Sequence, residues 1–385
     1  MIWPLGPDEF FRDHWEQRHF VSHGPPSRVE PIFQALGVRS TEAYLERRRE
    51  PVQIWSQTRE GDYITVRMEP PDALSLYRAG LTVYVSDVGQ LEPWKAVLGR
   101  QLGYEQAGPA SLFGARSGAE TRWHFDRLEN FTVQLSGTKT WRVAPNRHVV
   151  KPLHNWVTRQ PILEEMRAYV TEVLPRGAPP GPTETFTLEP GSVLYLPRGY
   201  WHTVEATSGD SLSVIFLYAA TTWVTRVIMA LQYQLNALPA WREHTAEVLG
   251  DRRDDARARA KVGALLADLR ALVNRLTPED FVPDDVPPPP LTAGSRLSRN
   301  PLAFLTVEEL DGGKAKVRIS VRTANARSSE LEIEAALIPV CLLVRRRADS
   351  FLASEAAAAA PKVPFARVAD LLRVLWQAQA LRRGA

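Results

Sequence analysis

Two stretches that lie far apart in the chain decide the fold: TRWHFDRLENFTVQLSGTKTWRVAPN at residues 121–146 and PGSVLYLPRGYWHTVEA at residues 190–206. In the first, apolar and polar residues alternate over residues 131–135, which is the period of a β-strand. His124 and Asp126 stand just before this alternation, with one residue between them. In an extended chain both side chains leave the same face, about 6–7 Å apart along the backbone, so we expect them to converge on one ion.

The second stretch places another candidate ligand, His202, beyond a short buried strand. A Pro-Gly turn at 190–191 precedes the apolar run 192–196, and residues 197–199 turn the chain again before the histidine. Two neutral imidazoles and one carboxylate hold a divalent ion by three positions and leave the others open for substrate and oxygen. The set therefore indicates iron(II) oxygen chemistry.

The order and spacing of these residues resemble those of JmjC-type dioxygenases, which depend on 2-oxoglutarate. The matching features are His-X-Asp at 124–126, Lys139 in Gly-Thr-Lys, and Leu-Tyr-Leu-Pro-Arg-Gly-Tyr-Trp-His at 194–202. Within that superfamily the sequence is most similar to the ribosomal-protein hydroxylases and to the asparaginyl hydroxylase of the hypoxia response. The latter pattern has a Thr before the first ligand and an Asn after it, where this chain has Thr121 and Asn130.

The resemblance implies that three residues bind Fe(II) and carry catalysis: His124, Asp126 and His202. It also implies that Lys139 and Thr121 hold the distal carboxylate of the co-substrate 2-oxoglutarate, with Asn130 near the end that chelates the metal. A Lys suits a carboxylate in a narrow cavity, although many ribosomal-protein members carry Arg there. A Tyr often completes the carboxylate site in relatives, and Tyr84 is a candidate for that role.

Each of these residue types also occurs in ordinary structural settings, so the prediction depends on their joint pattern. A lone His-X-Asp on a strand is common without a metal, and a Lys after Gly-Thr is usually a solvated turn residue. Four residues flank the ligands: Trp123, Arg127, Tyr200 and Trp201. They either line a substrate path or belong to the core, and aromatic residues beside a strand usually belong to the core.

The composition is that of a soluble globular protein with more than one domain. The chain has 385 residues, 44% of them hydrophobic and 24% charged, with a net charge of +3. The single cysteine, Cys341, excludes an internal disulfide framework and fits a reducing compartment. The start has no pattern of a secretory signal, and the apolar run 335–344 is too short to span a bilayer. We therefore expect a cytoplasmic protein that does not enter membranes.

The pattern of elements predicts an α+β chain whose residues 1–220 form a double-stranded β-helix, the jelly roll of cupin and JmjC proteins. Helices are expected at residues 7–20, 40–50, 92–102 and 161–173. Strands are expected at residues 52–55, 64–68, 81–85, 111–115, 192–196 and 211–218. A barrel of short strands with Gly and Pro corners would hold the ligands inside its mouth.

Residues 221–282 change character and predict a helical region. Apolar residues recur at helical spacing over 224–235 and again over 262–276, with the charged, solvated stretch GDRRDDARARAK at 250–261 between them. The resemblance to the ribosomal-protein hydroxylases implies that such a region forms a homodimer. The alternative is that both apolar stripes pack on this chain's own domains.

Residues 283–290, with four consecutive prolines, predict a stiff linker, and residues 291–385 a small C-terminal domain. Strands are expected at 302–307 and 315–322 with a final helix at 365–382, and the alanine run 356–360 is expected to be a mobile loop. The resemblance implies a winged-helix-like fold. The arginines of residues 291–385 are spread out and indicate no recognition helix. This distribution favours a contact with protein over binding to nucleic acid.

Together, the residues and the resemblance indicate an Fe(II)- and 2-oxoglutarate-dependent dioxygenase that hydroxylates a side chain of a protein or peptide, with a ribosomal protein as one candidate substrate. One alternative is a tailoring hydroxylase of a peptide or amino acid in a biosynthetic pathway. Another is a non-catalytic metal-binding interaction protein, although the intact ligand set and Lys139 favour an enzyme. Demethylation uses the same iron chemistry, and the sequence does not distinguish it from hydroxylation.

Overall fold

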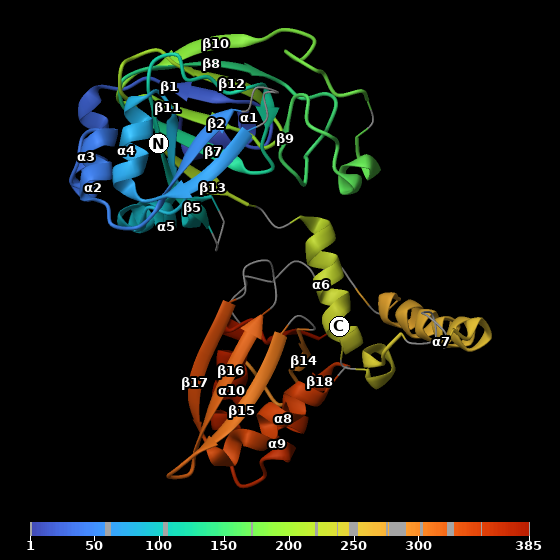
Figure 1. Ribbon diagram of the computed structural model, residues 1–385. Helices are drawn as coiled ribbons and strands as arrows, with labels where there is room; N and C mark the ends of the chain where they lie inside the picture. The colour runs from blue at the N-terminus through green and yellow to red at the C-terminus, as the bar shows by residue number, and fades with distance from the viewer. Residues whose placement is uncertain are drawn as a thin grey trace. The chain divides into compact units, whose positions relative to one another are not determined.

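The chain forms two compact units, Met1–Ala220 and Thr221–Ala385, in a computed structural model (Figure 1). The structure describes residues 2–57, 63–102, 107–170, 172–219, 222–236, 238–245, 253–274, 276, 290–300, 303–321, 327–347 and 349–384. In this described part, no helix has the length and apolar character needed to cross a membrane.

The first unit is built on two antiparallel sheets. The larger sheet has eight strands in the spatial order β1 (Phe20–Ser22), β11 (Val193–Leu196), β7 (Glu129–Ser136), β13 (Ser211–Tyr218), β5 (Ala107–Ala115), β4 (Thr82–Val85), β2 (Val52–Gln57) and β3 (Tyr63–Met68). The smaller sheet has the order β10 (Glu184–Leu188), β8 (Lys139–Ala144), β12 (Trp201–Ala206), β6 (His124–Phe125) and β9 (Trp156–Val157). From β7 to β13 the chain passes repeatedly between the sheets, which confirms the predicted cupin and JmjC type of fold.

Helices cover the outer face of the larger sheet (Figure 1). They are α1 (Pro7–Asp13), α2 (Glu30–Leu36), α3 (Thr41–Arg47), α4 (Pro70–Arg78) and α5 (Glu92–Gln101). Prolines stand in the first turns of α1, α2, α4 and α5, where the missing N–H has no helical partner to lose. Helix α3 instead begins at Ser40, whose hydroxyl accepts a hydrogen bond from the Ala43 N–H.

Strand β11 explains the continuous apolar run in the second motif, because it is buried on both faces. Val193 and Tyr195 belong to the core between the larger sheet and the helices. Leu194 and Leu196 point the other way and join Trp141 of β8 in a core between the two sheets. Successive side chains leave opposite faces of a strand, so a strand covered on both sides needs apolar residues at every position.

Strand β7 has an apolar face and a polar face, and both are buried. The apolar set Phe131, Val133 and Leu135 packs toward the helices. Asn130 and Thr132 are also buried, and their side chains hydrogen-bond to each other at 2.8 Å. The apolar residues that predicted the strand therefore belong to the core between the larger sheet and the helices. The polar residues between them face the space between the two sheets.

The turn between β7 and β8 requires glycine at position 137. Gly137 has φ +63°, and a Cβ there would collide with the Asp210 backbone oxygen and lie 2.9 Å from the Ser211 Cα. Both obstacles are backbone atoms that cannot rotate away. We expect Gly137→Ala to destabilise the first unit by about 2–4 kcal/mol, because strain at a positive φ adds to the clash.

Thermal unfolding followed by circular dichroism would measure this loss. Gly209→Ala is the matched control, because a Cβ at Gly209 would meet nothing within 4 Å. An unchanged melting temperature for Gly137→Ala would contradict the assignment of this turn as rigid.

Two helix predictions in the first unit are wrong in extent. The helix expected at 7–20 ends at Asp13, because Glu16 adopts the left-handed conformation and the chain then enters β1. The helix expected at 161–173 is a single 3₁₀ turn, Glu164–Ala168. There Met166 is fully buried and the Tyr169 hydroxyl lies 2.7 Å from a ring nitrogen of His154, so tertiary contacts override helix propensity.

In the residues that the structure describes, the second unit contains two three-stranded sheets and five α-helices. One sheet has the order β15 (Ala303–Leu310), β16 (Lys314–Val321) and β17 (Arg327–Glu334). The other has the order β18 (Phe351–Leu352), β14 (Arg296–Arg299) and β19 (Leu381–Arg383). The helices of this unit are α6 (Trp223–Asn236), α7 (Asp255–Val273), α8 (Ile338–Arg346), α9 (Ala353–Ala359) and α10 (Phe365–Gln377). One apolar core joins both sheets to α8, α9 and α10.

One further prediction in this unit is wrong. The alanine run 356–360 is not a mobile loop, because most of it belongs to helix α9, where Ala353 and Ala356 are fully buried. Alanine has the highest helix propensity, so a run of it forms a helix once one side is covered. The described part of the charged stretch 250–261 is mostly exposed, as expected, and α7 begins within it at Asp255, with the Asp254 carboxylate accepting from the Arg257 N–H. The predicted linker 283–290 lies outside the described residues except for its last position.

Candidate metal centre

Three strand ends bring His124, Asp126 and His202 together in the first unit. His124 of β6 is the direct cross-strand partner of His202 of β12, and their ring centroids are 3.9 Å apart. Asp126 follows β6 immediately, and its backbone oxygen accepts a 2.7 Å hydrogen bond from the N–H of Gly199 in the turn before β12. Both ends of the site are thus fixed by backbone hydrogen bonds.

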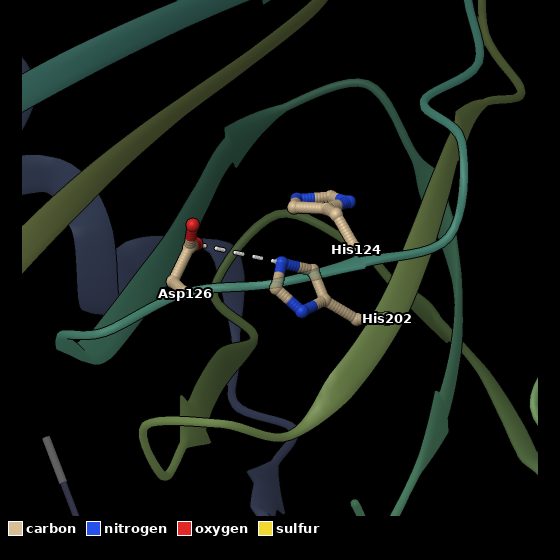
Figure 2. Close-up of side chains that lie close together, drawn as sticks. All are labelled: His124, Asp126 and His202. Atoms are coloured by element: carbon tan, nitrogen blue, oxygen red, sulfur yellow. Dashed lines mark ion pairs between the residues drawn. The ribbon is translucent and has the colours of Figure 1, made fainter. Parts of the chain in front are cut away.

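The three side chains converge on one point (Figure 2). One ligand atom from each residue lies within 4.8 Å of the other two. Figure 2 also marks the 3.7 Å between His202 Nε2 and an Asp126 carboxylate oxygen. The three residues from the two sequence stretches therefore meet, as their pattern predicted. Their role as metal ligands stays a prediction.

Both imidazoles are held in the tautomer that a metal requires. His124 Nδ1 lies 2.7 Å from the Arg122 carbonyl oxygen, and His202 Nδ1 lies 3.0 Å from the Tyr200 carbonyl oxygen. A carbonyl can only accept, so each Nδ1 carries the proton and donates it. Each Nε2 then keeps its lone pair toward the shared centre, which is the usual outer-shell support of a metal-binding histidine.

His202 is neutral under ordinary conditions. Burial, and next the adjacent His124, lower the pKa of His202 to about 4, although Asp126 opposes the shift. Its contact with Asp126 is therefore not an ion pair near neutral pH. Two neutral imidazoles and one carboxylate, close together and aimed at one point, fit a divalent ion such as Fe(II) that keeps other positions open.

The site opens into a cavity of about 450 Å³ between the two sheets. The cavity wall includes six of the residues that the sequence singled out for metal or co-substrate: Thr121, His124, Asp126, Asn130, Lys139 and His202. It also includes residues that the sequence did not single out, among them Trp55, Thr65, Thr82, Phe113 and Ser213. The volume is in the range of small-molecule sites in proteins.

Lys139 places a buried cation in this cavity. The side chain is on β8, the residue is 5% exposed, and its ammonium donates a 2.7 Å hydrogen bond to the Ser213 hydroxyl of β13. Among the described residues, no ion pair includes Lys139. Burial lowers the pKa of Lys139 to about 7. A buried ammonium without a carboxylate partner fits a site whose anion arrives with the ligand.

The lowered pKa of Lys139 predicts a pH dependence of stability in the protein without 2-oxoglutarate. Below pH 7 this lysine is protonated both folded and unfolded, and above its ordinary pKa of 10.5 it is neutral in both. Between these limits the unfolded chain binds one more proton than the folded chain. The free energy of unfolding therefore rises with pH, by up to about 1.4 kcal/mol per pH unit from this group.

Chemical denaturation at several pH values between 7 and 10 would test this, with Lys139→Met as the reference lacking the group. The parent chain should gain stability relative to that variant as the pH rises. Parallel curves for the two proteins would contradict the assignment of Lys139 as an unpaired buried cation.

Thr121 and Asn130 line the cavity with their polar atoms already partly engaged. The Thr121 hydroxyl accepts a 2.9 Å hydrogen bond from the Val204 N–H, and its backbone oxygen accepts from the Thr203 hydroxyl. The Thr121 hydroxyl proton stays available to a ligand. The Asn130 carbonyl accepts from Thr132, which fixes the orientation of its amide. Both positions are compatible with the roles that the resemblance implies.

Five other residues that the sequence singled out do not line the cavity: Tyr84, Trp123, Arg127, Tyr200 and Trp201. The Tyr84 hydroxyl lies 3.2 Å from the Ser111 hydroxyl, and its ring packs on Phe113 with centroids 4.6 Å apart. Trp201 is fully buried, edge-on to Phe125 at 4.9 Å, so it is a core residue and not part of a substrate path. The hydroxyl beside Lys139 comes instead from Ser213, which the sequence marked only as a polar residue within the apolar strand 211–218.

The fold and the site define a jelly-roll protein with a His-Asp-His cluster in a cavity. Residues 104–225 match the family model described as JmjC domain, so the chain carries a JmjC domain. It is 27% identical over 257 residues to the uncharacterized protein YxbC of Bacillus subtilis (strain 168), covering 63% of this chain and 77% of that protein.

The chain is also homologous to ribosomal oxygenases. It is 28% identical over 319 residues to ribosomal oxygenase 1 of Rattus norvegicus, covering 75% of this chain and 51% of that protein. The chain thus spans about half the length of that relative. The crystal structure of the Escherichia coli ribosomal oxygenase YcfD aligns with 98% of both chains at 17% identity and a TM-score of 0.44.

Proposed function

We propose that this chain is an Fe(II)- and 2-oxoglutarate-dependent dioxygenase that hydroxylates a side chain of a protein. The observation on which this rests is one cavity that contains a His-Asp-His cluster and, on its wall, the buried cation Lys139. The JmjC domain and the homology to ribosomal oxygenases support this reading and make a ribosomal protein the first substrate to test.

In the proposed site His124, Asp126 and His202 hold the metal, and Lys139 with Ser213 and Thr121 binds the distal carboxylate of 2-oxoglutarate. When bound, the metal and co-substrate supply the oxygen activation that places a hydroxyl group on a C–H bond. The chain contributes orientation: the carbonyls behind both imidazoles keep their Nε2 lone pairs aimed inward. Asn130 lines the same cavity, and we assign it to the end of the co-substrate nearest the metal.

The remaining assignments concern organisation. We propose that residues 1–220 are the oxygenase domain, 221–282 a dimerisation region, 283–290 a linker and 291–385 a winged-helix-like domain in a cytoplasmic protein. The order α8, β18, α9, α10, β19, with β14 as the third strand of their sheet, supports the last of these assignments. A homodimer is supported by exposed apolar side chains on α6 and α7: Trp223, Val224, Ile228, Val262, Leu266 and Val273.

Two measurements test the proposed activity. Purified chain with Fe(II) and 2-oxoglutarate should release succinate, and ribosomal proteins from the source organism should gain the mass of one oxygen atom when incubated with it. Mass spectrometry of those proteins from cells with and without the gene should locate the same change. The complete absence of 2-oxoglutarate turnover with every candidate substrate would rule out the enzyme. Loss of a methyl group instead of gain of oxygen would identify a demethylase.

A further inference from the structure

One wall of the cavity continues across the larger sheet to its last strand. Thr82 of β4, Trp55 of β2 and Thr65 of β3 are direct cross-strand neighbours, since Trp55 is paired with Thr82 on one side and with Thr65 on the other. All three line the cavity that holds the metal centre. The row of inward side chains therefore reaches from the cavity to the edge of the sheet at Thr65.

Strand β3 is an open edge. It is the last strand of the eight-stranded sheet, and among the described residues it pairs only with β2. Its register with β2 runs without a bulge from Tyr63 to Met68, and the strand contains no proline and one charged residue, Arg67. Natural edge strands are usually protected by prolines, charges, bulges or a covering element, so an unprotected edge beside a cavity is a candidate for pairing.

The other face of β3 is apolar and accessible. Ile64 and Val66 are each 46% exposed, and they alternate with Thr65, so they face away from the cavity. Val66 pairs across the strands with Ile54, which is buried in the helix-side core. The apolar surface of that core thus continues onto β3, where solvent reaches it.

We infer that β3 is the docking edge for an extended segment of the protein substrate, which adds to the sheet as a further strand. This inference rests on the proposed function and deepens it by naming the form in which the substrate binds. Only an extended main chain satisfies the alternating N–H and C=O groups of a strand edge, which a free amino acid cannot do. Neighbouring strands lie about 4.8 Å apart, so a residue placed opposite Thr65 projects toward the cavity as the next side chain in the row.

The geometry also sets a sequence preference. If the target residue faces the cavity beside Thr65, the residues immediately before and after it face the opposite side, beside Ile64 and Val66. Apolar or β-branched residues at those two positions would cover the exposed apolar surface of β3. The substrate class is therefore an unfolded or extended segment in which apolar residues flank the target.

The test uses short synthetic peptides that tile the ribosomal proteins of the source organism, incubated with the full chain, Fe(II) and 2-oxoglutarate. A peptide that gains oxygen is then resynthesised with a methyl group on one backbone nitrogen at a time. Strand addition predicts a period of two around the target: methylation at every second position lowers hydroxylation at least about tenfold, the effect of losing one or two hydrogen bonds, and the positions between stay within about twofold.

Variants of β3 supply the matching test on the enzyme. Proline is placed at Ile64, Thr65 or Val66, one position in each variant. Backbone N–H groups alternate in direction along a strand. The set therefore contains both amides that bond β2 and amides that point to the free edge. A variant that keeps the parent melting temperature and substrate-independent succinate release should lose peptide hydroxylation about tenfold or more. Those two readouts separate loss of docking from loss of fold or metal site.

The outcomes separate this inference from the proposed function. Two results would overturn strand addition and leave the proposed hydroxylase function standing. One is peptide hydroxylation with no alternation in the N-methyl scan. The other is full hydroxylation by a stable proline variant in which the replaced residue's N–H pointed to the free edge. A chain that turns over 2-oxoglutarate but hydroxylates no peptide contradicts both. Alternation together with the loss in β3 variants establishes the docking edge.

Discussion

Asp126→Ala is expected to lower the affinity for Fe(II) by more than 100-fold and to abolish 2-oxoglutarate turnover. Asp126 is the carboxylate of the cluster, lying 3.7 Å from His202 Nε2. Loss of a partner that only supports a metal ligand already costs about 10–100-fold in affinity or activity, so loss of the anionic ligand itself costs more. Two neutral imidazoles alone offer no charge to a hard divalent ion.

Calorimetric titration with Mn(II), an air-stable substitute for Fe(II), would measure binding, and succinate release would measure turnover. Asp87→Ala is the matched control, because Asp87 is an exposed aspartate of the same unit that does not line the cavity. The fold should survive in both variants, since the Asp126 side chain is partly exposed and its backbone oxygen still accepts from Gly199. Unchanged metal affinity in Asp126→Ala would refute the ligand assignment.

The common orientation of His124 and Asp126 could be predicted from the sequence because it is encoded over a short distance and needs only an extended segment. The place of His202 beside them depends on the pairing of β12 with β6, and it is predicted from the pattern of the second stretch and its resemblance to JmjC-type dioxygenases. The structure adds the reason for their orientation, which is the pair of backbone carbonyls behind the imidazoles. Such contacts depend on the exact path of the chain, and residue types alone do not specify that path.

Long-range parts of the site could not be predicted in this way. Ser213 reaches Lys139 only because β13 and β8 lie in opposite sheets, and Trp55 and Thr65 reach the cavity only through the pairing of β2 with β3 and β4. Nothing in the local sequence around these residues distinguishes them from other strand residues. The failed helix at 161–173 has the same cause, because burial of Met166 overrode a local preference.

Lys139→Met is expected to have two opposite effects, a loss of co-substrate binding and a gain of stability. Removing the only charged partner proposed for the distal carboxylate leaves that anion unpaired in the cavity, which costs about 3–5 kcal/mol, or roughly 150- to 5,000-fold in affinity for 2-oxoglutarate. In the protein without ligand, the same change removes a buried ammonium that is 5% exposed and has no ion-pair partner among the described residues. Replacing a buried ion pair by apolar groups of similar volume changes stability by about 0 to 4 kcal/mol in favour of the fold, and for this unpaired ammonium we expect a gain within that range.

The opposite signs make this prediction specific, because a residue with a merely structural role would lose stability and activity together. Binding would be measured by titration of 2-oxoglutarate into the Mn(II)-loaded chain, and stability by urea denaturation without ligand near pH 7. Lys151→Met is the matched control: Lys151 is an exposed lysine of the same unit whose partner is Glu16, so neither quantity should change by more than the effect of a surface ion pair. A Lys139→Met chain that binds 2-oxoglutarate as the parent does would show that another group holds the carboxylate. A destabilised Lys139→Met chain would contradict the assignment of Lys139 as an unpaired buried cation whose burial weakens the fold.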